Sequence, residues 1–205
     1  GDELLRAEAM SFRDALGVNH LDFGAAYYPW LHTTVVEEQD LSPANILNTD
    51  MLGLPATPDA PLLKNILAQA QRQLNLLPPA AAMAGIFTRV DNARGVWKAP
   101  ANVGMNSVVS PAVNITHEEQ EDLNVTPQGK SINAIRSFVG EGVLVWGART
   151  LDGNSLDWRY INVRRTMIML EESCRLAAKA MAFETNVTGN WVNVKSMIEN
   201  LLTDI

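Results

Sequence analysis

The sequence contains few of the residues from which disulfides, metal sites and covalent catalytic sites are built. Cys174 is the single cysteine among 205 residues, so the chain can form neither an internal disulfide nor a cysteine-based metal cluster. The histidines His20, His32 and His117 lie far apart, and none is spaced for joint metal binding. We therefore expect no metal site, and a reducing place of synthesis fits this composition.

Clusters of positive charge and long apolar runs are also missing. The net charge is -7 and no group of lysines or arginines occurs, so a phosphate backbone would be repelled. No run of about 18 apolar residues occurs, which is the length that a membrane-spanning helix needs. Nucleic acid is therefore not an expected partner, and we expect no direct insertion into a membrane.

The glycines between the apparent strands do not form a cofactor motif. Gly140, Gly142 and Gly147 resemble a dinucleotide-binding fingerprint, but its third glycine belongs at position 145, which is valine. They also precede the apparent strand 143–146, whereas the fingerprint follows a strand and opens a helix. No Walker-type phosphate loop and no Gly-x-Ser-x-Gly motif occurs. We read the glycines as a turn, and we expect no cofactor-binding and no catalytic residues.

What the chain does contain is an ordinary globular composition, with 47% apolar and 19% charged residues. We predict a single domain over residues 1–205, with a long irregular loop at about 37–61 that several prolines punctuate. Apolar residues at helical spacing predict helices over residues 2–16, 61–77, 162–183 and 191–202. Extended segments are predicted within residues 20–36, 102–114, 132–138 and 143–146.

Some segments carry more specific local signals. Residues 80–90 fit either a helix or a buried strand. Thr116 and Glu119 form a capping-box pattern, which predicts a short helix ending near Leu123. Pro29 predicts that any strand there is broken or lies at an edge. A turn at 152–154 followed by a second strand is expected before the longest helix. Helices alternating with short strands predict an α/β fold, with α+β as the alternative, in which helices flank a mixed sheet.

The longest predicted helix combines an apolar stripe with two arginines. Its apolar residues step by three or four, which predicts one continuous buried stripe formed by Val163, Met167, Leu170, Cys174, Ala177 and Met181. Arg164 and Arg165 stand at the N-terminal end, where the helix dipole disfavours cations. They therefore need carboxylate or carbonyl partners, and two sources remain open: the same chain or a neighbouring subunit. With Arg149, they are our candidate subunit contacts.

Several motifs, in this order, resemble the contractile tail sheath family, which includes phage tail sheaths and the sheaths of R-type pyocins and extracellular contractile injection systems. The resemblance covers roughly residues 27–202. Its motifs are Tyr27–Trp30, Gly95–Asn102, Ile132–Arg136, Val145–Leu151, Trp158–Arg165, and Phe183-Glu184 with Trp191.

The resemblance implies a structural protein and not an enzyme. Sheath subunits stack as six-fold rings around an inner tube, and the sheath contracts to drive the tube through a target envelope. The implied partners are further copies of the chain, the inner tube protein, and baseplate and terminator proteins. The implied location is a phage tail or phage-tail-like particle made in the bacterial cytoplasm. As structural anchors packed in the core we expect Trp97, Trp146 and Trp158.

The resemblance also sets limits on what the chain represents. Family members continue beyond Ile205, and helix-like sequence follows Gly1 directly, so we expect a core domain whose N- and C-terminal extensions lie outside this sequence. Two alternatives remain. One is a baseplate or adaptor protein with the same domain. The other is an α/β small-molecule enzyme, which would require residues such as Glu141, Arg149 and Arg165 to converge in one pocket.

Overall fold

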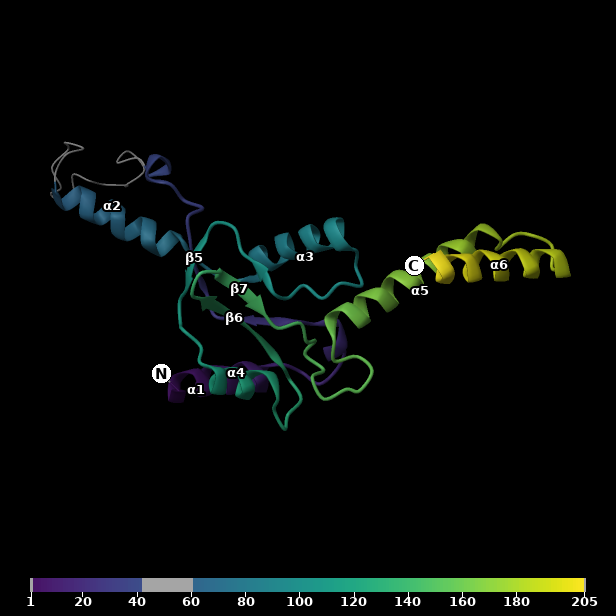
Figure 1. Cartoon of the computed structure of the whole chain (residues 1–205), viewed down its shortest axis with the longest axis horizontal. Helices are drawn as coiled ribbons and strands as arrows, with labels where there is room; N and C mark the ends of the chain where they lie inside the picture. The colour runs from purple at the N-terminus through teal and green to yellow at the C-terminus, as the bar shows by residue number, and fades with distance from the viewer. Residues whose placement is uncertain (1, 42–60, 205) are drawn as a thin grey trace.

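Two small sheets form the centre of the computed structural model, which describes residues 2–41 and 61–204 (Figure 1). The four-stranded sheet has the order β1-β6-β7-β4. Its strands are β1 (Ala26–Tyr28), β6 (Ile132–Phe138), β7 (Gly142–Trp146) and β4 (Val103–Gly104). β1 runs parallel to β6, whereas β7 is antiparallel to both of its neighbours. The sheet is therefore mixed, as the sequence predicts.

The second sheet has the order β3-β2-β5 and is antiparallel. Its strands are β2 (Leu31–Thr33), β3 (Leu76–Leu77) and β5 (Val108–Pro111). Pro29 separates β1 from β2, which belong to different sheets, so the predicted break at this proline is confirmed. Gly140, in the turn between β6 and β7, and Gly142, the first residue of β7, have φ of 82° and 81°, a left-handed backbone that favours glycine.

Helices account for most of the remaining described residues. They are α1 (Asp2–Ala15), α2 (Pro61–Leu74), α3 (Ala80–Arg94), α4 (His117–Asn124), α5 (Ile161–Ala180) and α6 (Thr188–Asp204), with single 3-10 turns at Leu21–Phe23 and Glu38–Asp40. α2 is shorter than predicted because its last expected residues form β3. The ambiguous segment 80–90 is helical. Most of the predicted loop 37–61 falls on residues 42–60, which lie outside the described part.

The capping box before α4 is confirmed by reciprocal hydrogen bonds. The backbone N of Glu119 donates to Oγ1 of Thr116 at 3.2 Å, and the backbone N of Thr116 donates to Oε2 of Glu119 at 2.7 Å. Two backbone N–H groups, one on the cap residue and one in the first helical turn, are thereby satisfied. α4 then places Leu123, which is 1% exposed, into the core.

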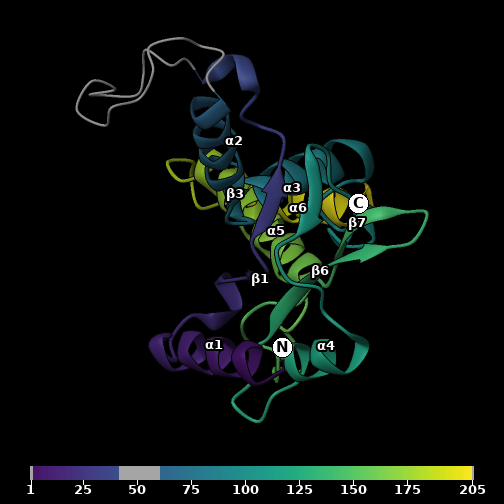
Figure 2. The ribbon, with the colours of Figure 1, turned by 90° about the vertical axis from the view of Figure 1, so that its left-hand side faces the viewer.

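The core lies on both faces of the four-stranded sheet because residues alternate along β6. Ile135, paired with Val145 on β7, packs against an apolar face of α3 formed by Met83, Ile86 and Val90. Two further β6 residues pack in a second cluster with residues of α1 and α4, and that cluster contains Ile132, Ala134, Ala9, Ile115 and Leu123. Figure 1 shows α3 on one side of the sheet and α1 and α4 on the other, and Figure 2 places α1 beside α4. We call the two sheets with α1, α3 and α4, together with the adjoining segments 16–25, 95–102 and 147–160, the body.

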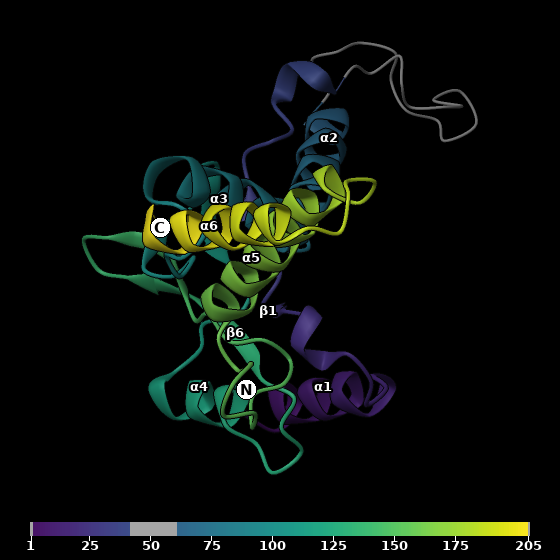
Figure 3. The same ribbon diagram turned by 90° about the vertical axis from the view of Figure 1, so that its right-hand side faces the viewer.

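Two predictions about the C-terminal part are wrong. The stripe along α5 is not continuously buried: of the described α5 residues only Ile161 and Arg164 are buried, and Cys174 is half-buried. The physical reason is that α5 leaves the body after its first turn and packs on α6 (Figures 1 and 3). The second strand expected after the turn at 152–154 is also missing from the described chain. This segment has two isolated β-bridges instead, Lys130 with Asp152 and Arg149 with Tyr160.

Candidate functional site

The first turn of α5, residues 161–165, joins this helix to the body, and we call it the α5 root. Ile161 is buried, and its backbone N donates to the carbonyl oxygen of Ala148 at 3.0 Å. Nδ2 of Asn162 donates to the carbonyl oxygen of Trp97 at 3.2 Å. Main-chain carbonyls from two separate loops therefore hold the start of the helix, in addition to the contacts of its arginines.

Arg164 is buried between two aromatic rings at the root. Its guanidinium carbon lies 4.0 Å from the ring centroid of Phe23 and 4.7 Å from that of Trp158. Its Nε lies 3.1 Å from Oδ2 of Asp22, and Glu171 lies farther away at 3.9 Å. A guanidinium is weakly hydrated and stacks on aromatic faces, while the carboxylate compensates the buried charge. This arrangement offsets the unfavourable position of a cation at a helix N-terminus.

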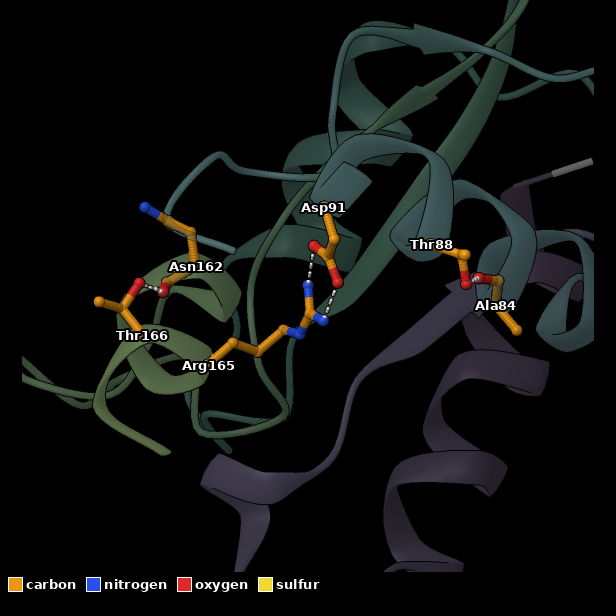
Figure 4. Close-up of polar contacts among 6 residues, drawn as sticks. All are labelled: Ala84, Thr88, Asp91, Asn162, Arg165 and Thr166. Carbon is orange, nitrogen blue, oxygen red and sulfur yellow. Dashed lines mark hydrogen bonds and ion pairs between the residues drawn. The ribbon is translucent and has the colours of Figure 1, made fainter. Parts of the chain in front are cut away.

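Arg165 forms a two-pronged ion pair with Asp91 on α3 (Figure 4). Nη1 donates to Oδ1 at 2.8 Å and Nη2 donates to Oδ2 at 2.5 Å. The guanidinium carbon also lies 5.0 Å from the ring centroid of Phe87. The hydrogen bonds with Asp91 raise the pKa of Arg165 above its ordinary value. Paired N–H···O bonds of this kind fix orientation as well as distance.

The structure thus supplies partners for both arginines from within the chain, the first of the two sources that the sequence left open. Arg149 has internal contacts as well: its Nη1 donates to the carbonyl oxygen of Gly153 at 3.3 Å, and its guanidinium carbon lies 5.9 Å from the Tyr160 ring centroid. Glu141 lies exposed in the β6–β7 turn. The residues proposed for an enzyme pocket therefore have separate surroundings: Arg165 binds α3, and Arg149 contacts its own loop.

The tryptophans do not lie where we predicted. Trp97 is 51% exposed and Trp146 is 37% exposed, so the expectation of core packing is wrong for both. Trp146 ends β7 opposite Ala134, and its ring centroid lies 4.6 Å from that of Phe138. The Trp97 ring covers the backbone of Gly95. A Cβ atom added at Gly95 would lie 2.4 Å from this ring. Trp158, stacked on Arg164, is half-buried.

Sequence reasoning missed a second polar junction, between Arg13 on α1 and Lys130 just before β6. Arg13 donates to the carbonyl oxygens of Lys130, Asp122 and Leu123 at 2.9–3.0 Å, and Nζ of Lys130 donates back to those of Arg13 and Leu16. The only signal in the sequence is that Arg13 follows Ala9 by four residues on the face that becomes buried.

Beyond the root, the α5–α6 hairpin carries exposed apolar side chains. None of the α6 residues 188–203 is buried. The most exposed large apolar residues here are Leu176, Phe183, Trp191, Val192 and Leu202, each more than half exposed. A shallow cavity of about 530 Å³ lies between the 181–186 turn and α6, with Met181, Trp191, Val194 and Ile198 in its lining. Exposed apolar side chains gathered on one hairpin make it a candidate interaction surface.

Neither a metal site nor a membrane-spanning helix occurs within residues 2–41 and 61–204. No group of three or more histidine, cysteine, aspartate or glutamate side chains is placed to hold a metal ion there. In the same residues, every helix is too short or too polar to span a bilayer.

Comparison with known proteins gives consistent matches. Residues 22–151, more than half of the chain, match the model of the phage tail sheath protein central domain. The tail sheath protein of Enterobacteria phage T4 is 26% identical over 110 residues, which are 54% of this chain and 16% of the relative. A putative prophage major tail sheath protein of Pseudomonas aeruginosa strain UCBPP-PA14 is 28% identical over 127 residues, which are 60% of this chain and 31% of the relative.

Solved structures extend the match to nearly the whole chain. The PVC sheath complex of an extracellular contractile injection system, in its contracted state, has a TM-score of 0.69 and 33% identity over 96% of this chain. The baseplate of the anti-feeding prophage has a TM-score of 0.58 and 44% identity over 62% of it. These matches cover 43% and 34% of the respective relatives, so the chain spans less than half of their length. The chain shares its α/β fold with the matched PVC sheath structure.

Proposed function

The chain belongs to the phage tail sheath protein family, and we propose that it forms part of a structural subunit of a contractile tail sheath. The subunits would stack as six-fold rings around an inner tube and contract to drive the tube through a target envelope. The relatives that match are tail sheath proteins and not enzymes. The matched PVC complex is a sheath in its contracted state, and this supports the proposal.

The observation that carries the proposal is the exposed apolar surface of the α5–α6 hairpin. A pair of helices without a third layer buries too little surface to shield its own apolar residues. Trp191, at 68% exposure, and Val192, at 55%, would be costly to leave in water. A sheath offers repeated copies of the same chain against which such a hairpin can pack. We therefore propose that this surface contacts neighbouring protein in the assembly.

The proposal also covers the domain organisation of the chain and its partners in the assembly. We take residues 1–205 as one core domain, with the inner tube, baseplate and terminator proteins as partners beside other copies of the chain, and with synthesis in the bacterial cytoplasm. Arg149, Arg164 and Arg165 remain candidate subunit contacts, although each already has partners inside the chain. Trp97, Trp146 and Trp158 act as anchors at the surface of the body and not in its core.

Electron microscopy of the full-length protein, expressed together with its tube protein, tests the proposal. We expect rings or tubes with the copies running along the whole tube. A Val192→Glu substitution should abolish or shorten them, because it places a charge in the proposed contact surface. Asn193→Glu, at the neighbouring exposed position, is the matched control and should assemble normally.

The outcomes separate the parts of the proposal. Wild-type protein that stays monomeric in the presence of its tube would contradict a sheath role. Assembly of Val192→Glu as efficient as wild type would contradict the hairpin contact alone. The second candidate is a baseplate protein, favoured by the match at 44% identity to the anti-feeding prophage baseplate. It predicts copies confined to one end of the particle.

A further inference from the structure

The α5–α6 hairpin is attached to the body through the α5 root. Ile161, Asn162, Arg164 and Arg165 supply its polar contacts with the body. Farther along α5 the polar side chains bond within the helix: Ser173 donates to the carbonyl oxygen of Met169, and Arg175 pairs with Glu172. The main packing partner of α5 is α6 (Figures 1 and 3). The hairpin thus projects from the body on one turn of helix.

The two arginines of the root bind two different parts of the body. Arg164 forms an ion pair with Asp22, without a hydrogen bond from Nε, and stacks on Phe23; both partners belong to the 3-10 turn Leu21–Phe23. Arg165 binds Asp91 on α3 with two parallel hydrogen bonds. One attachment point would leave the helix free to rotate about it. Two attachment points, reached by consecutive side chains about 100° apart around the helix, fix its direction.

We propose that the α5 root is a clamp that sets the angle at which the α5–α6 hairpin leaves the body. Loss of the charge at Asp22 or at Asp91 loosens the clamp. Loss of both charges lets the hairpin pivot, and the hairpin keeps its own structure. The aromatic contacts to Phe23 and Phe87 remain in such variants, so the hinge stays attached. Arg164 and Arg165 are positioning residues, because they act by aiming the exposed apolar surface of the hairpin.

The clamp involves residues of a single chain, so it does not depend on the proposed sheath role. Pivoting of the hairpin would change which surface the chain presents to a neighbour, whatever that neighbour is. A change of direction at a few residues of an element terminus is a common form of hinge motion. The test below uses the isolated chain, so its result is independent of whether the protein assembles into a sheath.

Spin-label distances between the hairpin and the body measure the angle directly. With Cys174→Ala to remove the native thiol, labels are placed at Ala84→Cys on α3 and Ser196→Cys on α6, both exposed positions. A second pair, Ala84→Cys with Ser137→Cys, reports on the body alone. We expect narrow distance distributions for both pairs in this background, measured by double electron–electron resonance.

Asp22→Asn and Asp91→Asn remove the charges with little change of shape. For the hairpin–body pair we expect a broader distribution in each single variant and the broadest in the double variant. The body pair should stay narrow and far-UV circular dichroism unchanged. Glu172→Gln, which breaks the exposed ion pair with Arg175 on the same helix, is the matched control and should leave both distributions narrow.

Two results would overturn the clamp. The first is a hairpin–body distribution that stays narrow in both single variants and in the double variant. The second is broadening of the body pair together with the hairpin pair, which would mean that the aspartates stabilise the body and do not aim the hairpin. Should the double variant fail to fold, the two single variants decide the question by the same criteria.

Discussion

Arg13 and Lys130 are buried cations whose hydrogen bonds cross between two segments of the body. Each donates to backbone carbonyl oxygens near a helix C-terminus: Lys130 donates to those at the end of α1, and Arg13 donates to those at the end of α4. Carbonyls there lack partners within the helix, and the dipole favours positive charge. Burial lowers the pKa of Arg13, while Asp122 acts in the opposite direction. Both cations therefore complete helix ends that would otherwise lie buried and unpaired.

We expect Lys130→Met to destabilise the fold by about 1–3 kcal/mol, because it leaves the carbonyl oxygens of Arg13 and Leu16 without their donor. Urea denaturation followed by circular dichroism measures the change. Lys98→Met, at an exposed position, is the matched control and should stay within about 0.5 kcal/mol of wild type. Equal stability of the two variants would mean that the Lys130 bonds contribute nothing net.

Gly147 has no room for a side chain. A Cβ atom there would lie 2.7 Å from Oδ1 and 3.1 Å from Cα of Asn133, a 1% exposed residue that bonds both main-chain groups of Arg149. We expect Gly147→Ala to cost about 1–3 kcal/mol in the free energy of unfolding. Gly85→Ala, in α3 with nothing within 4 Å, should instead stabilise by up to about 1 kcal/mol. Thermal denaturation that moves both variants in the same direction would refute this contrast.

At the scale of elements, α1 is held against β1 as well as against α4. The hydroxyl of Tyr28 on β1 donates to Oε2 of Glu8 on α1 at 3.0 Å. Burial, followed by this bond and the charge of Glu8, raises the pKa of Tyr28 from about 10 to about 12. The neutral phenol is thus favoured in the folded state, and the stabilisation that follows from the raised pKa of Tyr28 is lost only as pH rises above about 10.

Because the folded-state pKa is the higher one, stability is lost as pH rises from about 10 to about 12. We expect Tyr28→Phe to flatten this loss by about 1 kcal/mol, a figure reduced for solvent screening because the contact lies near the surface. Urea midpoints at a series of pH values, compared between the variant and wild type, test it. Parallel curves across this range would show that Tyr28 does not link α1 to β1 in this way.

At the scale of the whole molecule, the body and the hairpin differ in how they are stabilised. The body encloses residues such as Leu31, Ile135 and Val145, each 0% exposed, between sheet and helices. The hairpin packs one helix on another and meets the body through the α5 root. Regions with few buried apolar contacts open more readily than a closed core.

We therefore expect the backbone amides of α6 and of the second half of α5 to exchange with deuterium about ten-fold or more faster than those of β6 and β7. Hydrogen–deuterium exchange read by mass spectrometry on the isolated chain measures this. In the assembled particle the difference should shrink, because neighbouring protein covers the hairpin. Equal protection of hairpin and sheet in the isolated chain would contradict the division into body and hairpin.

Local sequence patterns were sufficient to predict structure wherever that structure depends on residues close together in the chain. Thr116 and Glu119 specify the start of α4 by bonding three residues apart, and Pro29 separates two strands because proline interrupts a ladder. Ile132, Ile135 and Phe138 mark one strand of the central hairpin, and the apolar run 143–146 marks the other. The order of several motifs likewise indicated the sheath family, since residues 22–151 match its central domain.

Only the tertiary structure showed which residues each apolar face and each charged side chain contacts. The spacing of the α5 stripe shows that one face is apolar, but an apolar face has the same spacing whether its cover is the body, α6 or another chain. The arginines of the α5 root required carboxylates, yet only the fold brings Asp22 and Asp91 to them, across more than 70 residues for Arg165. The sequence by itself therefore determined most of the elements and the family, but neither the short strand β3 nor the absence of a strand after residues 152–154 in the described chain. The burial and pairing of the elements came from long-range packing, because the distance between residues in space is not encoded in local periodicity.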